Sequence, residues 1–318
     1  MNVSFIVPLY NNLPLTQGMV ASLQATLPPG LAHEILLIDD GSTDGTRAWL
    51  AGLAGGAASS AAAPFRVLLN DRNLGFAATN NRAAAEARGE HLVLLNNDLI
   101  FPAGWFEPLL QAHHALGRRA GVVGNLQFNA RTGALDHAGI RCNEKGKPEH
   151  DRQRPTLAER LLRPVRRVPA VTAACLILDA DLWRQLGGFD EGYVNGGEDV
   201  DLCFRARAAG RINAVALRSA VRHYVSAAPG RKLRDEANSH RLAARWHEAF
   251  IACAAREWCR QYVRAIQREP RNFAPGAAAR IWLHAIGLTR RPPRQAVDSL
   301  RRALDLEFAR WKELGVNA

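Results

Sequence analysis

The feature that most constrains this chain is a regular alternation of apolar runs and helix-like stretches over its first hundred residues. The apolar runs are continuous, as in strands buried on both faces, and they occupy residues 3–10, 34–40, 65–70 and 91–98. Helix-like stretches lie between them, at residues 14–27, 43–53 and 76–88. Because strand–helix–strand repeats fold into a parallel sheet covered by helices, the sequence predicts a doubly wound α/β domain.

Polar side chains follow each predicted strand. Ligands of a doubly wound sheet lie beyond the carboxyl ends of its strands, so these residues are the first candidates for a binding site. They are Tyr10, Asn11 and Asn12 after the first strand, residues 39–42 after the second, residues 70–75 after the third, and Asn96, Asn97 and Asp98 after the fourth.

Beyond residue 120 the elements become shorter and mixed. Strand-like runs at 121–128 and 135–142 lead into a stretch rich in Pro and Arg, residues 145–169, for which we expect a mobile loop. The pattern then predicts the following elements in order: a strand at 171–180, a short helix at 181–186, a helix at 200–209, and a strand that ends near His223. The remainder reads as helical, with apolar residues at three- and four-residue steps from 295 to 314.

A length of 318 residues exceeds one ordinary domain. We expect a first domain over residues 1–226 and a helical, basic C-terminal region over residues 227–318. From His240 onward the chain has 15 Arg and Lys against 7 Asp and Glu, a net charge of +8 out of a total of +11. Such a region suits an anionic partner, and membrane contact and packing on the first domain both remain open. No recognised nucleic-acid-binding module accompanies the charge, so no nucleic-acid partner is expected.

The cysteine pattern indicates the kind of cellular compartment in which the chain works. Five cysteines without CxxC spacing favour reduced thiols in a cytosol over a zinc knuckle or a disulfide framework. The chain begins with a strand-like run rather than a signal peptide, and no apolar run approaches the roughly 20 residues of a transmembrane helix. A cytoplasmic protein is therefore expected.

Three acidic positions have a functional interpretation beside a structural one. Asp40 could accept hydrogen bonds from a base or ribose, or could belong to a plain turn and helix N-cap. Asp98 could bind Mg²⁺ or Mn²⁺ on a diphosphate, or could simply form a turn. Glu198 and Asp199 follow paired glycines and could supply a general base, or could only complement a helix dipole.

Six segments, taken together, resemble family 2 glycosyltransferases with the GT-A fold. They are, in order, VPLYNN, LIDDGSTDGT, NDRNLGFAATNN, LLNND, LGGFDEGYVNGGEDVDLCFRARAAG and RHY. The resemblance covers residues 3–226 and is closest to the bacterial branch that includes rhamnosyltransferases and other polysaccharide-building enzymes. It implies a mixed, mainly parallel sheet flanked by helices, here with a helical C-terminal extension.

The resemblance also implies roles for individual residues. Asp40 would contact the uracil or thymine base, and Asp199 would be the catalytic base, with Glu198 as a near alternative or an acceptor-binding partner. The remaining nucleotide-sugar contacts would be Pro8, Tyr10, Asn11, Arg72, Asn73, Gly75, Asn80 and Asn97.

A divalent cation, Mg²⁺ or Mn²⁺, is implied by the same resemblance. Asp98 stands at the last position of the family's DxD motif, and His223 matches a late histidine that completes the metal site in many members. The chain departs from that motif at Asn96, where the family often has a carboxylate, so a lower metal affinity is expected. A lone histidine at a strand end also has an ordinary structural interpretation.

The activity implied is an inverting transfer from a dTDP- or UDP-linked sugar, with rhamnose a candidate. The acceptor would be a hydroxyl of a glycan or a lipid-linked molecule in cell-surface polysaccharide synthesis, at the inner face of the membrane. The alternative is a non-catalytic carbohydrate- or membrane-binding protein on a degenerate GT-A scaffold. A nicotinamide-dependent oxidoreductase is disfavoured because VPLYNN, not GxGxxG, follows the first strand, and no P-loop is present.

Overall fold

The computed structural model describes residues 2–56, 65–143, 147–224, 235–268 and 275–316. The chain forms two compact units. The first consists of residues 1–139 and 150–232, and the second of residues 140–149 and 233–318. The division expected at residue 226 stays a prediction, and the structure groups the short segment 140–149 with the C-terminal helices.

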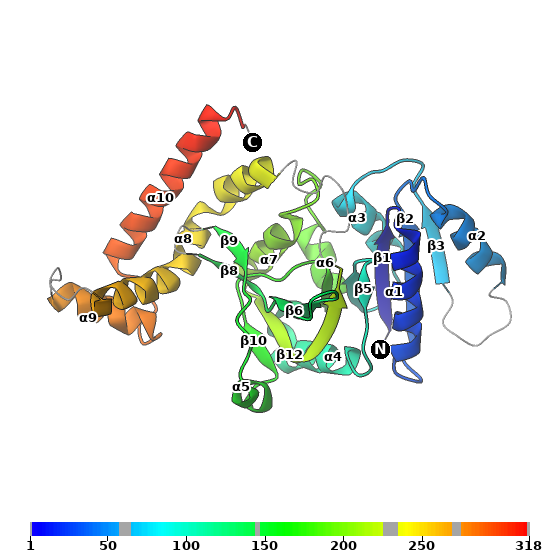
Figure 1. The fold of residues 1–318 in the computed structure, drawn as a ribbon, viewed down its shortest axis with the longest axis horizontal. Coiled ribbons are helices and arrows are strands. Elements are labelled where there is room, and N and C mark those ends of the chain that lie inside the picture. The colour runs from blue at the N-terminus through cyan, green and yellow to red at the C-terminus, as the bar shows by residue number, and fades with distance from the viewer. Residues whose placement is uncertain (1, 57–64, 144–146, 225–234, 269–274, 317–318) are drawn as a thin grey trace. The chain divides into compact units, whose positions relative to one another are not determined.

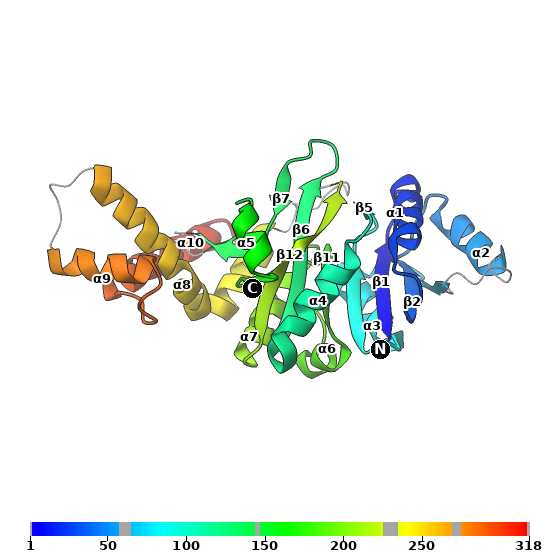
Figure 2. The same cartoon turned by 90° about the horizontal axis from the view of Figure 1, so that it is seen from below.

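The first unit is built on one mixed sheet (Figures 1 and 2). Four parallel strands form one half in the order β3-β2-β1-β4: β1 (Val3–Leu9), β2 (His33–Asp39), β3 (Phe65–Leu69) and β4 (His91–Leu95). The other half continues as β11-β6-β12-β10: β6 (Ala120–Asn129), β10 (Val165–Arg167), β11 (Cys175–Asp179) and β12 (Ile212–His223). Strand β11 runs antiparallel to both β4 and β6, whereas β12 runs parallel to β6. The mixed sheet confirms the predicted fold class.

Two short strands complete this sheet at its carboxyl edge. Strand β5 (Leu99–Ile100) pairs with the end of β12, so that Leu99 lies opposite His223. Strand β7 (Leu135–His137) pairs with β6. The β5–β12 pairing brings the residue before β5, Asp98, beside the last residue of β12.

Helices flank the sheet and close its core. They are α1 (Leu13–Thr26), α2 (Thr46–Gly56), α3 (Phe76–Glu86), α4 (Phe106–Leu116), α5 (Leu157–Leu162), α6 (Ala180–Leu186), α7 (Glu198–Ala208) and a 3₁₀ turn at Gly117–Arg119. On β1 alternate residues such as Phe5 and Val7 point into one apolar cluster with Trp105 and Phe106, the first residues at α4. Their neighbours on the strand are buried too, so both faces of β1 are covered, as its continuous apolar run predicts.

Two expectations about the middle of the chain were wrong. The run at 135–142 is not one strand, because Gly139 adopts a φ of +110° between β7 and β8 (Ile140–Cys142). Residues 147–169 are not a loop: they contain β9 (Pro148–His150), α5 and β10, while residues 145 and 146 lie outside the described residues. Arginines that suggested a loop instead form contacts, since Arg166 pairs with Glu159 at 2.8 Å.

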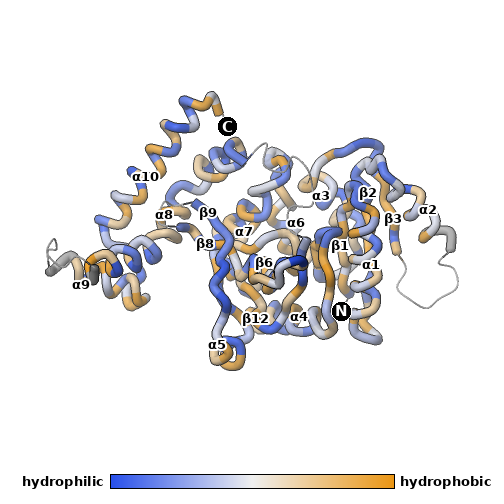
Figure 3. Tube along the Cα trace, viewed as in Figure 1, coloured by the Kyte–Doolittle hydropathy of each residue, from blue (hydrophilic) through white to orange (hydrophobic). Residues whose placement is uncertain are grey.

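In the part of the second unit that the structure describes, the elements are three helices and the β8–β9 hairpin. The helices are α8 (Asp235–Arg268), α9 (Pro275–Ala285) and α10 (Arg294–Glu313), and α8 is kinked at Trp246. On α10, whose hydropathy alternates within each turn (Figure 3), Leu300, Leu304 and Trp311 are buried, which confirms the predicted helix. Across the described residues, every helix is too short or too polar to span a membrane.

Candidate active site

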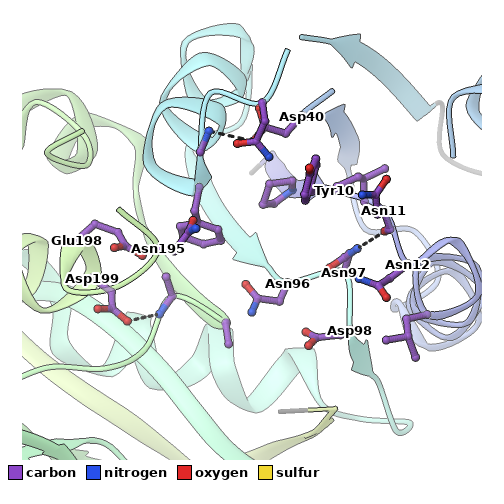
Figure 4. Close-up of a pocket in the computed structure, with 18 of the residues that line it drawn as sticks. Tyr10, Asn11, Asn12, Asp40, Asn96, Asn97, Asp98, Asn195, Glu198 and Asp199 are labelled. Atoms are coloured by element: carbon purple, nitrogen blue, oxygen red, sulfur yellow. Dashed lines mark hydrogen bonds between the residues drawn. The ribbon is translucent and has the colours of Figure 1, made fainter. Parts of the chain in front are cut away.

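A cavity of about 450 Å³ opens at the carboxyl ends of β1, β2 and β4 (Figure 4). Its lining comes from the ends of these strands, from the start of α3, from the segment before β11 and from the start of α7. The lining residues are Pro8, Leu9, Tyr10, Asn11, Asn12, Leu15, Asp40, Asn73, Gly75, Phe76, Asn96, Asn97, Asp98, Thr172, Ala173, Ala174, Asn195, Glu198 and Asp199. The cavity thus lies at the strand ends, where ligands of a doubly wound sheet bind.

Three asparagines in this lining have a left-handed backbone. Asn11, Asn12 and Asn195 have φ values of 55°, 58° and 56°, and within the described residues they are the only non-glycine positions with positive φ. Such conformations cost free energy and persist where surrounding contacts hold them, often at functional sites. The contacts are visible at Asn11, whose N–H donates to Ser42 Oγ at 2.8 Å and whose Oδ1 accepts from the Thr43 N–H at 2.8 Å.

The two aspartates at the end of β2 have different roles. Asp39 is fully buried and accepts hydrogen bonds from the Ser42 N–H and from Arg47, so it holds the turn. Asp40 lines the cavity and accepts from the Leu74 N–H at 2.8 Å and the Gly75 N–H at 3.0 Å.

The carboxylate of Asp40 also keeps spare acceptor capacity. Asn70 Nδ2 donates to its Oδ1 at 2.8 Å, which brings its donors among the described residues to three. A carboxylate offers about four lone-pair sites, so Asp40 can still accept a hydrogen bond from a ligand.

The loop before α3 packs tightly on the β2 turn. A Cβ on Gly41, where φ is +76°, would lie 2.6 Å from Arg72 C and Asn73 N. Asn73 and Gly75 line the cavity, whereas Arg72 is exposed and outside the lining. Asn80 is also outside it: the residue is buried in α3, where its Nδ2 donates to the Phe76 carbonyl at 2.8 Å.

The predicted metal ligands lie side by side. Asp98 Oδ1 and His223 Nε2 are 3.1 Å apart and both side chains are buried. Neither atom has an aligned hydrogen-bond partner among the described residues, and Asn96 Oδ1 is likewise buried without one. Neighbouring ligands of an octahedral ion bound at 2.0–2.1 Å are separated by about 3 Å. The donor set and its spacing thus fit a Mg²⁺ or Mn²⁺ ion.

Asn97 lies between Asn96 and Asp98 in the sequence, but its side chain contacts α1 instead of His223. Its Nδ2 donates to Thr16 Oγ1 of α1 at 2.9 Å and lies 3.5 Å from the Asn11 carbonyl (Figure 4). Although Asn97 contributes to the lining, its amide group is used mainly to hold the β4 end against α1.

The start of α7 presents two carboxylates to the cavity, across from Tyr10 and Asp40 (Figure 4). Asp199 Oδ2 accepts from the Ala173 N–H at 3.1 Å, and Glu198 Oε2 accepts from the Gly196 N–H at 2.8 Å. Asp199 is therefore aimed along the segment that precedes β11, in an arrangement that can receive a proton from a hydroxyl in the cavity.

The third acidic residue of that turn, Asp201, has a structural role. It is fully buried and pairs with Arg205 at 2.7 Å. Arg205 in turn donates to the carbonyls of Leu186 and Gly188, which attaches α7 to the turn after α6.

Some lining residues were not predicted from the sequence. Residues 172–174 were expected to lie in a strand, but the strand begins at Cys175 and they form one wall of the cavity. Asn195 was missed as well, although an asparagine before two glycines is a common signal for left-handed backbone.

Comparisons with known proteins identify the family of this chain. Residues 4–162 match the profile of glycosyl transferase family 2. The chain is 34% identical over 220 residues to the O-antigen biosynthesis protein RfbC of Myxococcus xanthus, covering 65% of this chain and 16% of that protein. It is 29% identical over 292 residues to the N-acetylglucosaminyl-diphospho-decaprenol L-rhamnosyltransferase of Mycobacterium tuberculosis, covering 80% and 85%.

Similarity extends to solved structures and defines the fold. The crystal structure of GalNAc-T7 with UDP, GalNAc and Mn²⁺ superposes with a TM-score of 0.60 at 17% identity, covering 89% of this chain and 54% of that one. Two of the curated relatives are much longer, and the chain spans a quarter or less of their length. Because the family profile spans half of the chain and the sheet has the GT-A arrangement, this protein belongs to glycosyl transferase family 2, a family of glycosyltransferase enzymes.

Proposed function

We propose that this protein transfers a sugar from a nucleotide-diphosphate sugar to a hydroxyl of a glycan or lipid-linked acceptor during polysaccharide synthesis. The observation that supports it best is the single cavity that gathers Asp40, Asp98 and Asp199 from three distant parts of the chain. Relatives described as an O-antigen biosynthesis protein and a rhamnosyltransferase support the polysaccharide context and make dTDP-rhamnose a donor to test first.

The nucleotide would occupy the β1–β2 side of the cavity. Tyr10 is 46% exposed at the rim and offers an aromatic face to a base, while Asp40 retains an acceptor site for the base N–H. Pro8, Asn11 and the loop residues Asn73 and Gly75 line the same side. The proposed contacts of Arg72 and Asn80 stay predictions, since neither lines the cavity as described above.

A divalent cation would be held by Asp98 and His223, with the donor's phosphates as further ligands. When bound, such an ion neutralises the negative charge that develops on the departing diphosphate. The uncompensated Oδ1 of Asn96 offers a hydrogen-bond acceptor or a weak ligand in place of a second carboxylate. The choice between Mg²⁺ and Mn²⁺ is open, and the Mn²⁺ found with GalNAc-T7 makes it a natural first choice.

Asp199 would act as the general base. An acceptor hydroxyl gives up its proton to the carboxylate while its oxygen attacks the anomeric carbon from the face opposite the diphosphate, so the anomeric configuration inverts. The Ala173 N–H donates to Oδ2 at 3.1 Å and the Val200 N–H donates to Oδ1 at 2.8 Å, so the carboxylate is held in one orientation. Glu198 lies beside it with one oxygen bound to the Gly196 N–H, which suits a role in holding the acceptor.

A donor screen tests the proposal. The protein is incubated with UDP- and dTDP-linked sugars, dTDP-rhamnose included, with Mn²⁺ or with EDTA, and with N-acetylglucosaminyl-diphospho-polyprenol as acceptor. We expect acceptor-dependent release of nucleoside diphosphate that EDTA abolishes. Donor binding without turnover under every condition would instead favour the non-catalytic alternative, and turnover that EDTA leaves unchanged would remove the metal assignment.

We also propose that the second unit contacts the surface of a membrane that contains anionic lipids. Around the end of α9, Trp282 and Ile286 are each 50% exposed and Leu288 is 71% exposed, and Arg280 and Arg290 are exposed nearby. Exposed aromatic and aliphatic side chains flanked by arginines suit insertion at an interface with anionic headgroups.

Vesicle flotation tests this contact. Vesicles with phosphatidylglycerol should recover the wild type but not the double variant Trp282→Ser/Ile286→Ser, while vesicles of phosphatidylcholine alone should recover little of either. Leu157→Ser is the matched control, because Leu157 is 70% exposed on α5 in the first unit. Equal flotation of the double variant and the control would contradict the proposal.

A further inference from the structure

A second cluster of polar side chains lies at the opposite end of β4 from the cavity. His91 is the first residue of β4, whereas Asn96 follows its last residue, and five strand residues span about 15 Å. Strand β11 runs antiparallel to β4, so its last residue, Asp179, lies directly opposite His91. His113 and His114, in the last turn of α4, complete the cluster.

The side chains of this cluster converge. Asp179 Oδ1 is 2.9 Å from His91 Nδ1 and 3.5 Å from His113 Nε2. One ring nitrogen from each of His91, His113 and His114 can be chosen so that all three lie within 4.8 Å of one another. Three imidazoles from β4 and α4 therefore gather at one place, and the Asp179 carboxylate of β11 reaches two of them, His91 and His113.

Ordinary structural roles leave part of this arrangement unexplained. His113 is only 3% exposed, yet neither of its ring nitrogens has a hydrogen-bond partner among the described residues. Buried polar groups are nearly always satisfied, so this one needs a ligand or an unseen partner. An ion pair between His91 and Asp179 would account for those two residues but not for two further imidazoles beside them.

Asp179 supplies an independent observation. It stands at the N-cap position of α6, where an aspartate normally accepts a hydrogen bond from the helix N–H groups. Its side chain makes no such bond and turns toward the histidines instead. The Asp179 carboxylate therefore contacts the histidines and does not cap α6.

We propose that His91, His113, His114 and Asp179 form a Zn²⁺ site. Imidazole nitrogens and one carboxylate are typical zinc ligands at about 2.0–2.2 Å, and a tetrahedral shell of that size separates neighbouring ligand atoms by about 3.3 Å. The separations of 2.9 and 3.5 Å at Asp179 bracket that value. His114 is exposed, and its ring lies beside those of His91 and His113, where it would complete the shell.

The proposed ligand set bears on the role of the ion. With all four ligands supplied by the chain, the ion would be structural: it would fasten the end of α4 to the junction where antiparallel β11 joins β4.

The site is tested on the full chain after removal of metal with a chelator. Zn²⁺ is titrated in competition with a chromophoric chelator, and Co²⁺ is added separately to record the visible absorption of a tetrahedral complex. We expect one tight equivalent of Zn²⁺, a tetrahedral Co²⁺ spectrum and a higher Tm with Zn²⁺. His114→Ala should weaken Zn²⁺ binding by more than about tenfold. Loss of a residue that only hydrogen-bonds to a metal ligand already costs about tenfold in affinity, and loss of a ligand should cost more.

Two further variants make the result specific. Gln111→Ala, at an exposed position on the same helix, should bind Zn²⁺ as the wild type does. Asp98→Asn should also retain the tight equivalent, because that residue belongs to the active-site cavity. Zn²⁺ affinity that is equal in His114→Ala and the wild type, or a tight equivalent lost in Asp98→Asn, would overturn the proposal whatever the transferase activity.

Discussion

Neighbouring acidic residues on α7 differ in what they contact. Asp199 faces the cavity, and its replacement by asparagine keeps the size and one acceptor, for the Ala173 or the Val200 N–H, while removing the basic group. We expect Asp199→Asn to lower kcat for sugar transfer by about a hundredfold or more, the usual contribution of a general base, with little change in donor KM. Initial rates of nucleotide release at several donor concentrations measure both, and an unchanged kcat would remove Asp199 as the base.

Asp201 provides the contrasting case two residues further on. Removing its charge leaves Arg205, 14% exposed, without its carboxylate partner. Loss of one member of a buried ion pair costs about 3–5 kcal/mol. We therefore expect Asp201→Asn to lower the free energy of unfolding in urea by an amount of this order, with Asp199→Asn close to wild type in the same assay. The reverse order of stabilities would contradict the roles assigned to the pair.

The close packing at Gly41 sets the position of the loop that lines the proposed nucleotide side of the cavity. We expect Gly41→Ala to raise donor KM and to destabilise the fold, because its Cβ would meet the backbone at residues 72 and 73 at 2.6 Å. Gly30 has the same φ of +76° but open space around its Cβ, so Gly30→Ala carries only the backbone strain, roughly 1–2 kcal/mol. The difference in Tm and in KM between the two variants measures the effect of the contact between residue 41 and the backbone of residues 72 and 73.

At the scale of elements, the β6–β7 pair buries a histidine, and this burial makes the stability of the fold depend on pH. His137 is fully buried, and burial holds its pKa well below 6.5. The unfolded chain therefore binds a proton below about pH 6.5 that the folded chain does not, so the stability contributed by this group is present above that pH and is lost as the pH falls. One such group changes stability by at most about 1.4 kcal/mol per pH unit.

We expect His137→Leu to lose less stability than the wild type between pH 7 and pH 5, because leucine does not titrate. Urea midpoints at the two pH values measure the difference. Burial lowers the pKa of His113 as well, and His113 remains in both proteins, so the difference between them reports the loss of His137 with its effect on the neighbouring His150. Parallel losses in the two proteins would show that His137 is not the source.

At the scale of the whole molecule, the second unit is assembled from two separate stretches of chain. The hairpin β8–β9 lies before the last strands of the sheet in sequence but groups with α8 to α10. Within it, Ile140 and Cys142 are buried. A chain ended after residue 232 would keep the hairpin without its helices, so we expect it to be less soluble than the full chain. Light scattering after gel filtration tests this, and an equally monodisperse shortened chain would contradict it.

The order of β1, β2, β3 and β4 and the helices between them could be predicted from the sequence. These elements are specified locally, by continuous apolar runs and by helical composition, and their connections follow the right-handed crossover rule. The same local pattern located the strand-end residues Asp40 and Asp98 at the cavity. Family resemblance, rather than spacing, selected His223 and Asp199, because no short-range signal connects them to β4.

Pairings between distant segments were decided only by the tertiary structure. The insertion of β11 between β4 and β6 turned residues 172–174 into a cavity wall, and the β5–β12 pairing brought Asp98 within 3.1 Å of His223. The same insertion brought Asp179 to His91. The sequence by itself determined which segments become strands and helices and which polar residues end them, because those preferences are local. The tertiary structure decided which ends meet, because strand register depends on the whole buried core.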